Sequence, residues 1–200
     1  ELSIKHNKII SLDYIDNFVD GAAIKKVGVK NYNIVKDSIE EIYSIPKNEI
    51  CYNLVDIYQN DGIVLEPAGI LGLCLCDRIK EQINGKNVVC ILSGGNNDIM
   101  RYNEILERSL IYQGLKHYFI VDFNQRPGEL KEFVNNILVK NIDITRFEYL
   151  KKTNKEKGSV LLGIELNDKK EYNNFIYNLE KYNYRYKKLE DNSLIYNYLI

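Results

Sequence analysis

The sequence predicts an α/β protein in two parts, a parallel sheet with helices followed by an α+β domain of the ferredoxin-like type. Two short segments in the first half, residues 63–65 and residues 87–92 after their first residue, Asn87, are continuously apolar and are separated by a helical pattern. Such runs are typical of strands buried on both faces, as in parallel sheets. After residue 116 the strand-like segments alternate apolar and polar residues, in the order strand, helix, strand, strand, helix, strand. That order predicts the ferredoxin-like unit, here with an added terminal strand.

The first part covers residues 1–98, in which helical patterns alternate with the two apolar runs. Ser11 is expected to cap the first helix, and Gly28 to end it. Pro46 separates two further helical patterns, since proline interrupts a helix interior. The helical patterns cover residues 11–28, residues 37–62 with the break at Pro46, and a segment that begins at Pro67.

A helical connector is predicted over residues 99–116, followed by the second domain over residues 117–200. The segments 143–152 and 159–166 are joined by a polar turn and predict a hairpin. Each predicted helix carries a single apolar stripe. The expected strands are residues 117–123, 143–152, 159–166, 184–190 and 193–200, and the expected helices are residues 126–138 and 170–182.

Length and charge set outer limits on function. With 200 residues and 45% apolar content, the chain can form one full domain, or a small domain plus part of another. The formal net charge of -1 argues against the basic surface of a nucleic-acid binder. Residue 1 is Glu and the single methionine is Met100, so we expect the chain to be a piece of a longer protein.

The cysteines and the longest apolar run indicate a reducing, cytoplasmic setting without a metal site. The cysteines lie among apolar residues, lack C-x-x-C spacing, and have only two histidines as nitrogen partners. They are therefore expected to be small buried hydrophobes, with a disulfide or redox role as the alternative. The run from Pro67 to Cys76 is about half the length that a membrane helix needs. The four cysteines are Cys51, Cys74, Cys76 and Cys90, and the two histidines are His6 and His117.

A serine and two glycines follow the second apolar run. Ser93, Gly94 and Gly95 stand between a predicted strand and a helix, which is where open parallel sheets bind ligands. Glycines let a ligand approach the backbone, and the serine hydroxyl can donate or accept a hydrogen bond. The motif is short, so a ligand site and a simple tight turn both remain open.

Two further turns have similar features. Glu66 ends the first apolar run and precedes a helix begun by Pro67, so it either opens onto the same crevice as Ser93 or complements the helix dipole. Gly21 and Ala22 belong to a third small-residue turn, which from spacing alone is expected to have no function.

The second domain has one candidate site, the loop at residues 123–130. Pro127 and Gly128 open the helix there, and its free backbone N–H groups can bind an anion or a carboxylate. The alternative is a plain strand-to-helix turn that needs proline and glycine for its geometry.

Several motifs, in order along almost the whole chain, resemble the C-terminal half of biosynthetic threonine dehydratase, also called threonine ammonia-lyase. The motifs are FVDGAAIKKVG, IVLEPAGIL, KNVVCILSGGNND, ERSL, GLKHYFIVDF, QRPGELKEFV, DITRFEYLKK and GIELNDKKEY.

The resemblance implies a fold-type II pyridoxal-phosphate domain and a specific role for Ser93. The matching serine in the family hydrogen-bonds the pyridine nitrogen of pyridoxal 5'-phosphate. By the same correspondence Gly94 keeps the turn close to the ring, Gly21 and Ala22 line the cofactor's surroundings, and Glu66 lies near the active site.

The resemblance also implies that residues 117–200 are the single ACT-like regulatory domain of the short form, which senses isoleucine and in some members valine. Gln125, Arg126, Pro127 and Gly128 would form the effector-binding loop. The family pattern has a proline where Asn124 stands and commonly an alanine where Glu129 stands, which leaves effector identity and strength open.

The family's cofactor-anchoring lysine and phosphate-binding glycines are missing from this chain, so it contains no catalytic residue and is expected to be inactive alone. The main hypothesis is the C-terminal part of an enzyme that converts L-threonine to 2-oxobutanoate and ammonia for isoleucine biosynthesis, in a homo-oligomer that is usually tetrameric in the family. The alternative is a free-standing regulatory module that binds branched-chain amino acids without catalysis.

Overall fold

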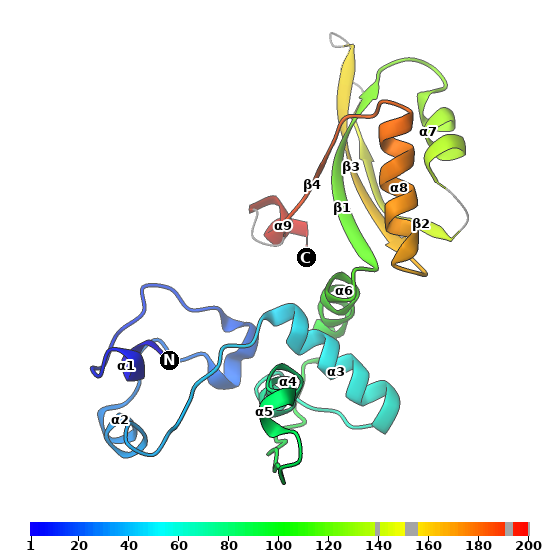
Figure 1. Ribbon diagram of the computed structural model, residues 1–200. Coiled ribbons are helices and arrows are strands. Elements are labelled where there is room, and N and C mark those ends of the chain that lie inside the picture. The colour runs from blue at the N-terminus through cyan, green and yellow to red at the C-terminus, as the bar shows by residue number, and fades with distance from the viewer. Residues whose placement is uncertain (139–140, 151–155, 191–193, 200) are drawn as a thin grey trace. The chain divides into compact units, whose positions relative to one another are not determined.

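The computed structural model describes residues 1–138, 141–150, 156–190 and 194–199. The chain divides into two compact units, Glu1–Ser109 and Leu110–Ile200 (Figure 1). The division falls inside the segment 99–116 that the sequence predicts as a helical connector. Residues 153–155 of the turn predicted at residues 153–158 lie outside the described residues.

The first unit is built from short helices around a core centred on α3. This helix begins after Pro46 and ends at Gly62, whose φ of 69° gives the left-handed cap that glycine adopts without strain. Ile50, Leu54 and Ile57 on α3 pack with Cys74 and Ile105. The helices are α1 (Leu2–Lys5), η1 (Asn17–Ala22), α2 (Val29–Val35), α3 (Lys47–Asp61), α4 (Leu71–Arg78), α5 (Lys80–Ile83), η2 (Ile99–Arg101) and α6 (Tyr102–Tyr112).

The helix predicted over residues 11–28 is wrong. The Asp16 carboxylate accepts the Phe18 N–H at 2.9 Å and thereby starts the 3-10 turn η1 in the middle of that segment. Ser11, expected to cap a helix, instead pairs with Lys26 in an isolated antiparallel bridge. The helical pattern before Pro46 is also wrong, because residues 39–46 are not helical and α2 lies upstream of them.

The apolar runs 63–65 and 87–92 contain no helix, and in the described residues neither forms a β-ladder. Their ends do meet, because the Glu66 N–H donates to the Gly94 carbonyl oxygen at 2.9 Å. Val89 and Ile91 are 88% and 81% exposed. A parallel sheet needs neighbouring strands and covering helices, and this exposed apolar surface shows that the segment lacks both.

The second unit contains an antiparallel sheet in the order β2-β3-β1-β4. Helices α7 and α8 cover one face of it (Figure 1), where Phe119, Phe123, Phe133 and Phe175 are fully buried. This is the ferredoxin-like arrangement that the strand and helix order predicts. The elements are β1 (Lys116–Asn124), α7 (Glu129–Ile137), β2 (Ile142–Tyr149), β3 (Lys157–Leu166), α8 (Lys170–Lys181), β4 (Tyr186–Lys188) and α9 (Leu194–Leu199).

The terminal strand predicted over residues 193–200 is wrong, since residues 194–199 form α9. Tyr196 of α9 is 2% exposed and packs edge-on against Tyr118, with ring centroids 6.2 Å apart. Tyr118 alternates with Phe119 along β1, so α9 covers the sheet face opposite α7 and α8. At the end of the chain, a helix that packs its Tyr196 ring on the sheet therefore stands in place of the predicted strand. No helix in the described part of the chain is long and apolar enough to cross a membrane.

Candidate functional site

The ends of the two apolar segments of the first unit meet backbone to backbone. The Glu66 N–H donates to the Gly94 carbonyl at 2.9 Å, and the Ser93 N–H donates to the Gly69 carbonyl at 3.4 Å. These two hydrogen bonds place Glu66 and Ser93 at one edge, as expected for neighbouring segments. We call the group Glu66, Gly69, Ser93 and Gly94 the glycine wall.

Glycine is required at two positions of the glycine wall. Gly94 has a φ of +73°, and a Cβ there would lie 2.2 Å from Cδ of Glu66. A Cβ at Gly69 would lie 1.4 Å from the carbonyl oxygen of Ser93. No side chain fits at either distance, so both glycines let the two segments touch. Gly69 was not among the residues predicted from the sequence, although its place just after Pro67 and Ala68 resembles the other small-residue turns.

The turn that contains Gly21 also comes against the glycine wall. A Cβ at Gly21 would lie 3.0 Å from Cβ of Ala68 and 3.5 Å from Oε1 of Glu66. Ala22, its neighbour, lines a separate hollow of about 520 Å³ between N-terminal segments. The structure therefore brings Gly21, Glu66, Ser93 and Gly94 together and places Ala22 at the edge of the group.

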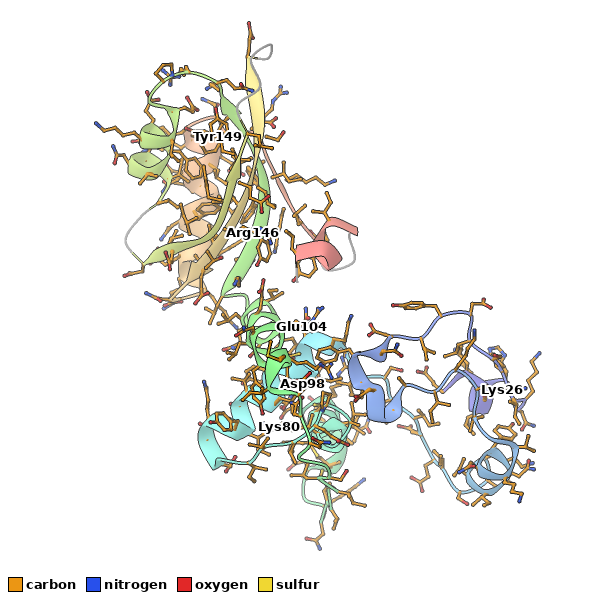
Figure 2. The ribbon with its side chains drawn as sticks, turned by 180° about the vertical axis from the view of Figure 1, so that it is seen from behind. Lys26, Lys80, Asp98, Glu104, Arg146 and Tyr149 are labelled. Atoms are coloured by element: carbon orange, nitrogen blue, oxygen red, sulfur yellow. The ribbon has the colours of Figure 1, made fainter. Side chains whose placement is uncertain are left out.

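Two side chains outside the predicted site residues hold these turns in place. Arg101 donates to the carbonyl oxygen of Phe18 at 2.6 Å, and its guanidinium lies 4.7 Å from the centroid of the Phe18 ring. The Asn97 amide donates to the carbonyl oxygen of Leu65 at 3.4 Å. Asp98, labelled in Figure 2, accepts the N–H of Met100 at 2.9 Å and starts η2, the turn that carries Arg101.

The glycine wall offers a hydroxyl, a carboxylate and a side-chain-free backbone. Ser93 is exposed, so its hydroxyl can reach a bound molecule. These groups fit the polar edge of a flat ring, such as a ring nitrogen that needs one hydrogen-bond partner. No cluster of side chains suited to a metal ion occurs in the part of the chain that the structure describes.

The candidate effector loop of the second unit, Gln125–Gly128, connects β1 to α7. Gly128, with φ +89°, precedes the first residue of α7. Arg126 Nε donates to Glu129 Oε2 at 2.9 Å, and Arg126 also pairs with Glu132. The loop therefore presents a guanidinium that is already bound by two carboxylates, and these hold the pKa of Arg126 above its usual value.

Glu129 is a buried carboxylate, 3% exposed. The Asn124 amide donates to its Oε1 at 3.2 Å. Burial raises the pKa of the nearby Tyr184 hydroxyl, and the negative charge of Glu129 raises it further. The polar residue at 124 and the acid at 129 thus belong to one network, in which Asn124 and Arg126 hold the Glu129 carboxylate.

A hollow of about 500 Å³ lies beside this loop. Arg126 and Glu129 contribute its polar side, and Leu130 and Val134 of α7 contribute apolar surface. Tyr149, labelled in Figure 2 at the end of β2, lines it as well. A hollow with one charged edge and branched aliphatic walls suits a small amino acid with an apolar side chain.

Comparison with known proteins identifies the family. Residues 2–94 match the family model described as pyridoxal-phosphate-dependent enzyme, and residues 107–199 match the C-terminal regulatory domain of threonine dehydratase. The chain is 48% identical over 198 residues to a biosynthetic L-threonine dehydratase of Halalkalibacterium halodurans. It is 45% identical over 191 and 198 residues to those of Lactococcus lactis and Bacillus subtilis.

The chain belongs to the biosynthetic threonine dehydratase family.

The alignments cover 96–99% of this chain and 46–48% of these threonine dehydratases, so the chain spans about half the length of the curated relatives it matches. Among solved structures, a processed threonine deaminase isoform 2 of Solanum lycopersicum superposes with a TM-score of 0.50 at 24% identity. That match covers 54% of this chain and 32% of the tomato chain and supports the fold. The two family matches confirm the predicted fold class, a pyridoxal-phosphate domain followed by a threonine dehydratase regulatory domain.

Proposed function

We propose that the chain is the C-terminal part of a pyridoxal-phosphate-dependent threonine ammonia-lyase, which converts L-threonine to 2-oxobutanoate and ammonia in isoleucine biosynthesis under feedback control by isoleucine. The observation that carries the proposal is the glycine wall. Ser93 and Glu66 come from segments separated in sequence, and the chain has glycine at each position where a Cβ would keep them apart.

The residues of the glycine wall have distinct roles in this proposal. Pyridoxal phosphate, when bound, supplies the electron-withdrawing ring through which the α-proton and the β-hydroxyl of threonine are eliminated. Ser93 Oγ would hold the ring nitrogen by a neutral hydrogen bond, which suits an elimination in which the leaving group carries off the charge. Gly94 lets the turn that carries Ser93 pack closely against the Glu66 side chain, and Gly21 and Ala22 line the surroundings of the cofactor. The Glu66 carboxylate forms the neighbouring side.

The second unit supplies the regulation. Arg126 binds the carboxylate of the effector, and Gln125, Pro127 and Gly128 shape the loop around it. Leu130 and Val134 contact its branched side chain, which favours isoleucine, with valine as the smaller competitor. The effector must compete with Glu129 and Glu132 for Arg126, because both carboxylates already bind this guanidinium.

Catalysis requires parts that this sequence does not contain. Its lysines do not stand in the family's cofactor-anchoring motif, and it has no phosphate-binding glycine run. We therefore infer that the chain alone is inactive, and that the cytoplasmic homo-oligomer, tetrameric in the proposal, includes an upstream catalytic half.

The proposal is tested on the chain by itself. Mixed with pyridoxal phosphate and L-threonine, it is expected to form no 2-oxobutanoate, and measurable turnover would refute the inference from the missing lysine. Titration calorimetry with L-isoleucine is expected to show saturable heat that Arg126→Ala abolishes. No heat from a folded chain would contradict the regulatory role, and D-isoleucine serves as the control ligand.

A further inference from the structure

Two thiols of the first unit face each other across α4 and the segment 87–92. Cys76 Sγ and Cys90 Sγ lie 3.0 Å apart. Both sulfurs also approach the Gly72 carbonyl oxygen, at 3.5 Å for Cys76 and 3.6 Å for Cys90. The two cysteines are half-buried, whereas Cys51 and Cys74 are fully buried in the core.

The backbone explains why these thiols meet. Gly72 lies one helical turn before Cys76, and a Cβ at Gly72 would be 3.6 Å from the Ile91 carbonyl oxygen. The segment 87–92 therefore runs directly against the side of α4 that carries Cys76. Disulfide sulfurs are about 2.0 Å apart, so an approach of about 1 Å closes this pair.

We propose that Cys76 and Cys90 form a reversible dithiol–disulfide site, oxidised by exchange with a small-molecule disulfide such as oxidised glutathione. One cysteine, as its thiolate, attacks the small disulfide, breaks its S–S bond and releases one small thiolate. The second cysteine then attacks the protein sulfur of the mixed disulfide, forming the Cys76–Cys90 bond and releasing the other small thiolate. The two protein thiols lose two electrons and two protons, and the small disulfide leaves as two thiols.

The proposed bond has a structural consequence for the glycine wall. Cys90 precedes Ser93 on the same segment, and α4 follows directly after Glu66 and Gly69. The cross-link joins the two segments whose ends make the Glu66–Gly94 and Ser93–Gly69 hydrogen bonds. Oxidation is therefore expected to hold the glycine wall closed, and reduction to let its two sides separate.

The rate of the exchange is expected to depend on pH. The hydrogen bond with Cys90 raises the pKa of the Cys76 thiol to about 11, and burial and the nearby negative charge of Asp77 act in the same direction. Arg78 also lies in this part of α4 but is paired with Glu49. A protonated Cys76 reacts slowly at neutral pH, so the cross-link is expected to form faster as the pH rises toward 9.

The test uses the full chain with oxidised glutathione, followed by alkylation of the remaining thiols and peptide mapping. Two of the four thiols are expected to disappear, and the peptides that contain Cys76 and Cys90 are expected to be recovered as one linked species. A reductant should restore all four. Linkage of another pair, or no linkage in a folded chain, would overturn the proposal.

Variants separate the cross-link from nonspecific oxidation. Cys76→Ser and Cys90→Ser should each stop at a single glutathione adduct on the remaining partner. Cys74→Ala, two residues before Cys76 on the same helix, should form the cross-link as the wild-type chain does. Cross-linking in Cys76→Ser equal to that of the wild-type chain would contradict the proposed Cys76–Cys90 disulfide. Two stable glutathione adducts on the wild-type chain would contradict it as well.

Discussion

The Glu66 amide donates a hydrogen bond to the Gly94 carbonyl at 2.9 Å, and the Glu66 side chain fills the space that a Cβ at Gly94 would need. The contact joins two segments that lack a β-ladder between them in the described residues. The position of these two segments against each other therefore depends on a few local interactions. Single substitutions in the glycine wall should strongly change the free energy of unfolding of the first unit.

Replacing Gly94 by alanine tests that contact. The new Cβ would lie 2.2 Å from Cδ of Glu66 in a backbone with φ +73°, so both sterics and strain oppose it. We expect a loss of about 2–3 kcal/mol in the free energy of unfolding of the first unit, measured by urea denaturation.

Gly85→Ala is the matched control for Gly94→Ala. Gly85 has a similar φ of +75°, but a Cβ there meets nothing within 4 Å. Gly85→Ala should lower the free energy of unfolding only through backbone strain, by about 1 kcal/mol. Equal losses for the two variants would show that the contact between Glu66 and Gly94 contributes nothing.

Glu129→Ala tests the competition for Arg126. Glu129 is buried and binds Arg126 at 2.9 Å, so its removal releases the guanidinium for an effector carboxylate. We expect isoleucine to bind about 10-fold more tightly in titration calorimetry, which corresponds to about 1.4 kcal/mol. The exposed pair with Glu132 contributes less, so Glu132→Ala should change the affinity by less than about 2-fold. Weaker binding to a folded Glu129→Ala chain would mean that Glu129 supports the site.

His117 gives the second unit a predictable response to pH. Burial, followed by the nearby charge of Lys188, lowers the pKa of His117 to about 4, whereas an unfolded histidine titrates near 6.5. Between these values the unfolded chain binds the proton and the folded chain does not, so this contribution to stability is complete above pH 6.5 and is lost as the pH falls toward 4. Because the ring is only partly buried, we expect a loss of about 1–2 kcal/mol.

His117→Asn isolates that effect from the titration of carboxylates. The variant keeps a polar group near the Gly114 carbonyl, which lies 3.0 Å from His117 Nε2, but it cannot titrate. The difference in unfolding free energy between pH 7 and pH 5 should therefore be smaller in the variant than in the wild-type chain. The same pH dependence in both would show that His117 is not responsible.

The second unit was predicted more fully than the first because its strands and helices are stabilised within the unit. Phe119 and Phe123 on β1, and Phe133 and Phe175 on the helices, share one buried face, so the periodicity of the sequence matches the packing. Only the last segment failed, since the packing of Tyr196 against Tyr118 favours a helix over a strand.

In the first unit local interactions override periodicity. Asp16 begins a 3-10 turn inside the predicted helix, and Val89 and Ile91 remain exposed although their pattern indicates a buried strand. Gly69 was missed because only the three-dimensional structure shows that its missing side chain makes room for the Ser93 carbonyl. Glu66 and Ser93 could be selected from the sequence, since each ends an apolar run and precedes a helix.

The most direct test joins this chain to the upstream half of the Bacillus subtilis threonine dehydratase, which this chain does not match, and measures 2-oxobutanoate formed from L-threonine. We expect turnover that isoleucine inhibits. We also expect a roughly 10- to 100-fold lower kcat for Ser93→Ala, as for the loss of one hydrogen bond to the cofactor, with activity retained in Ser93→Thr. A folded chimera that binds pyridoxal phosphate but forms no 2-oxobutanoate, or one that Ser93→Ala leaves unchanged, would contradict the account.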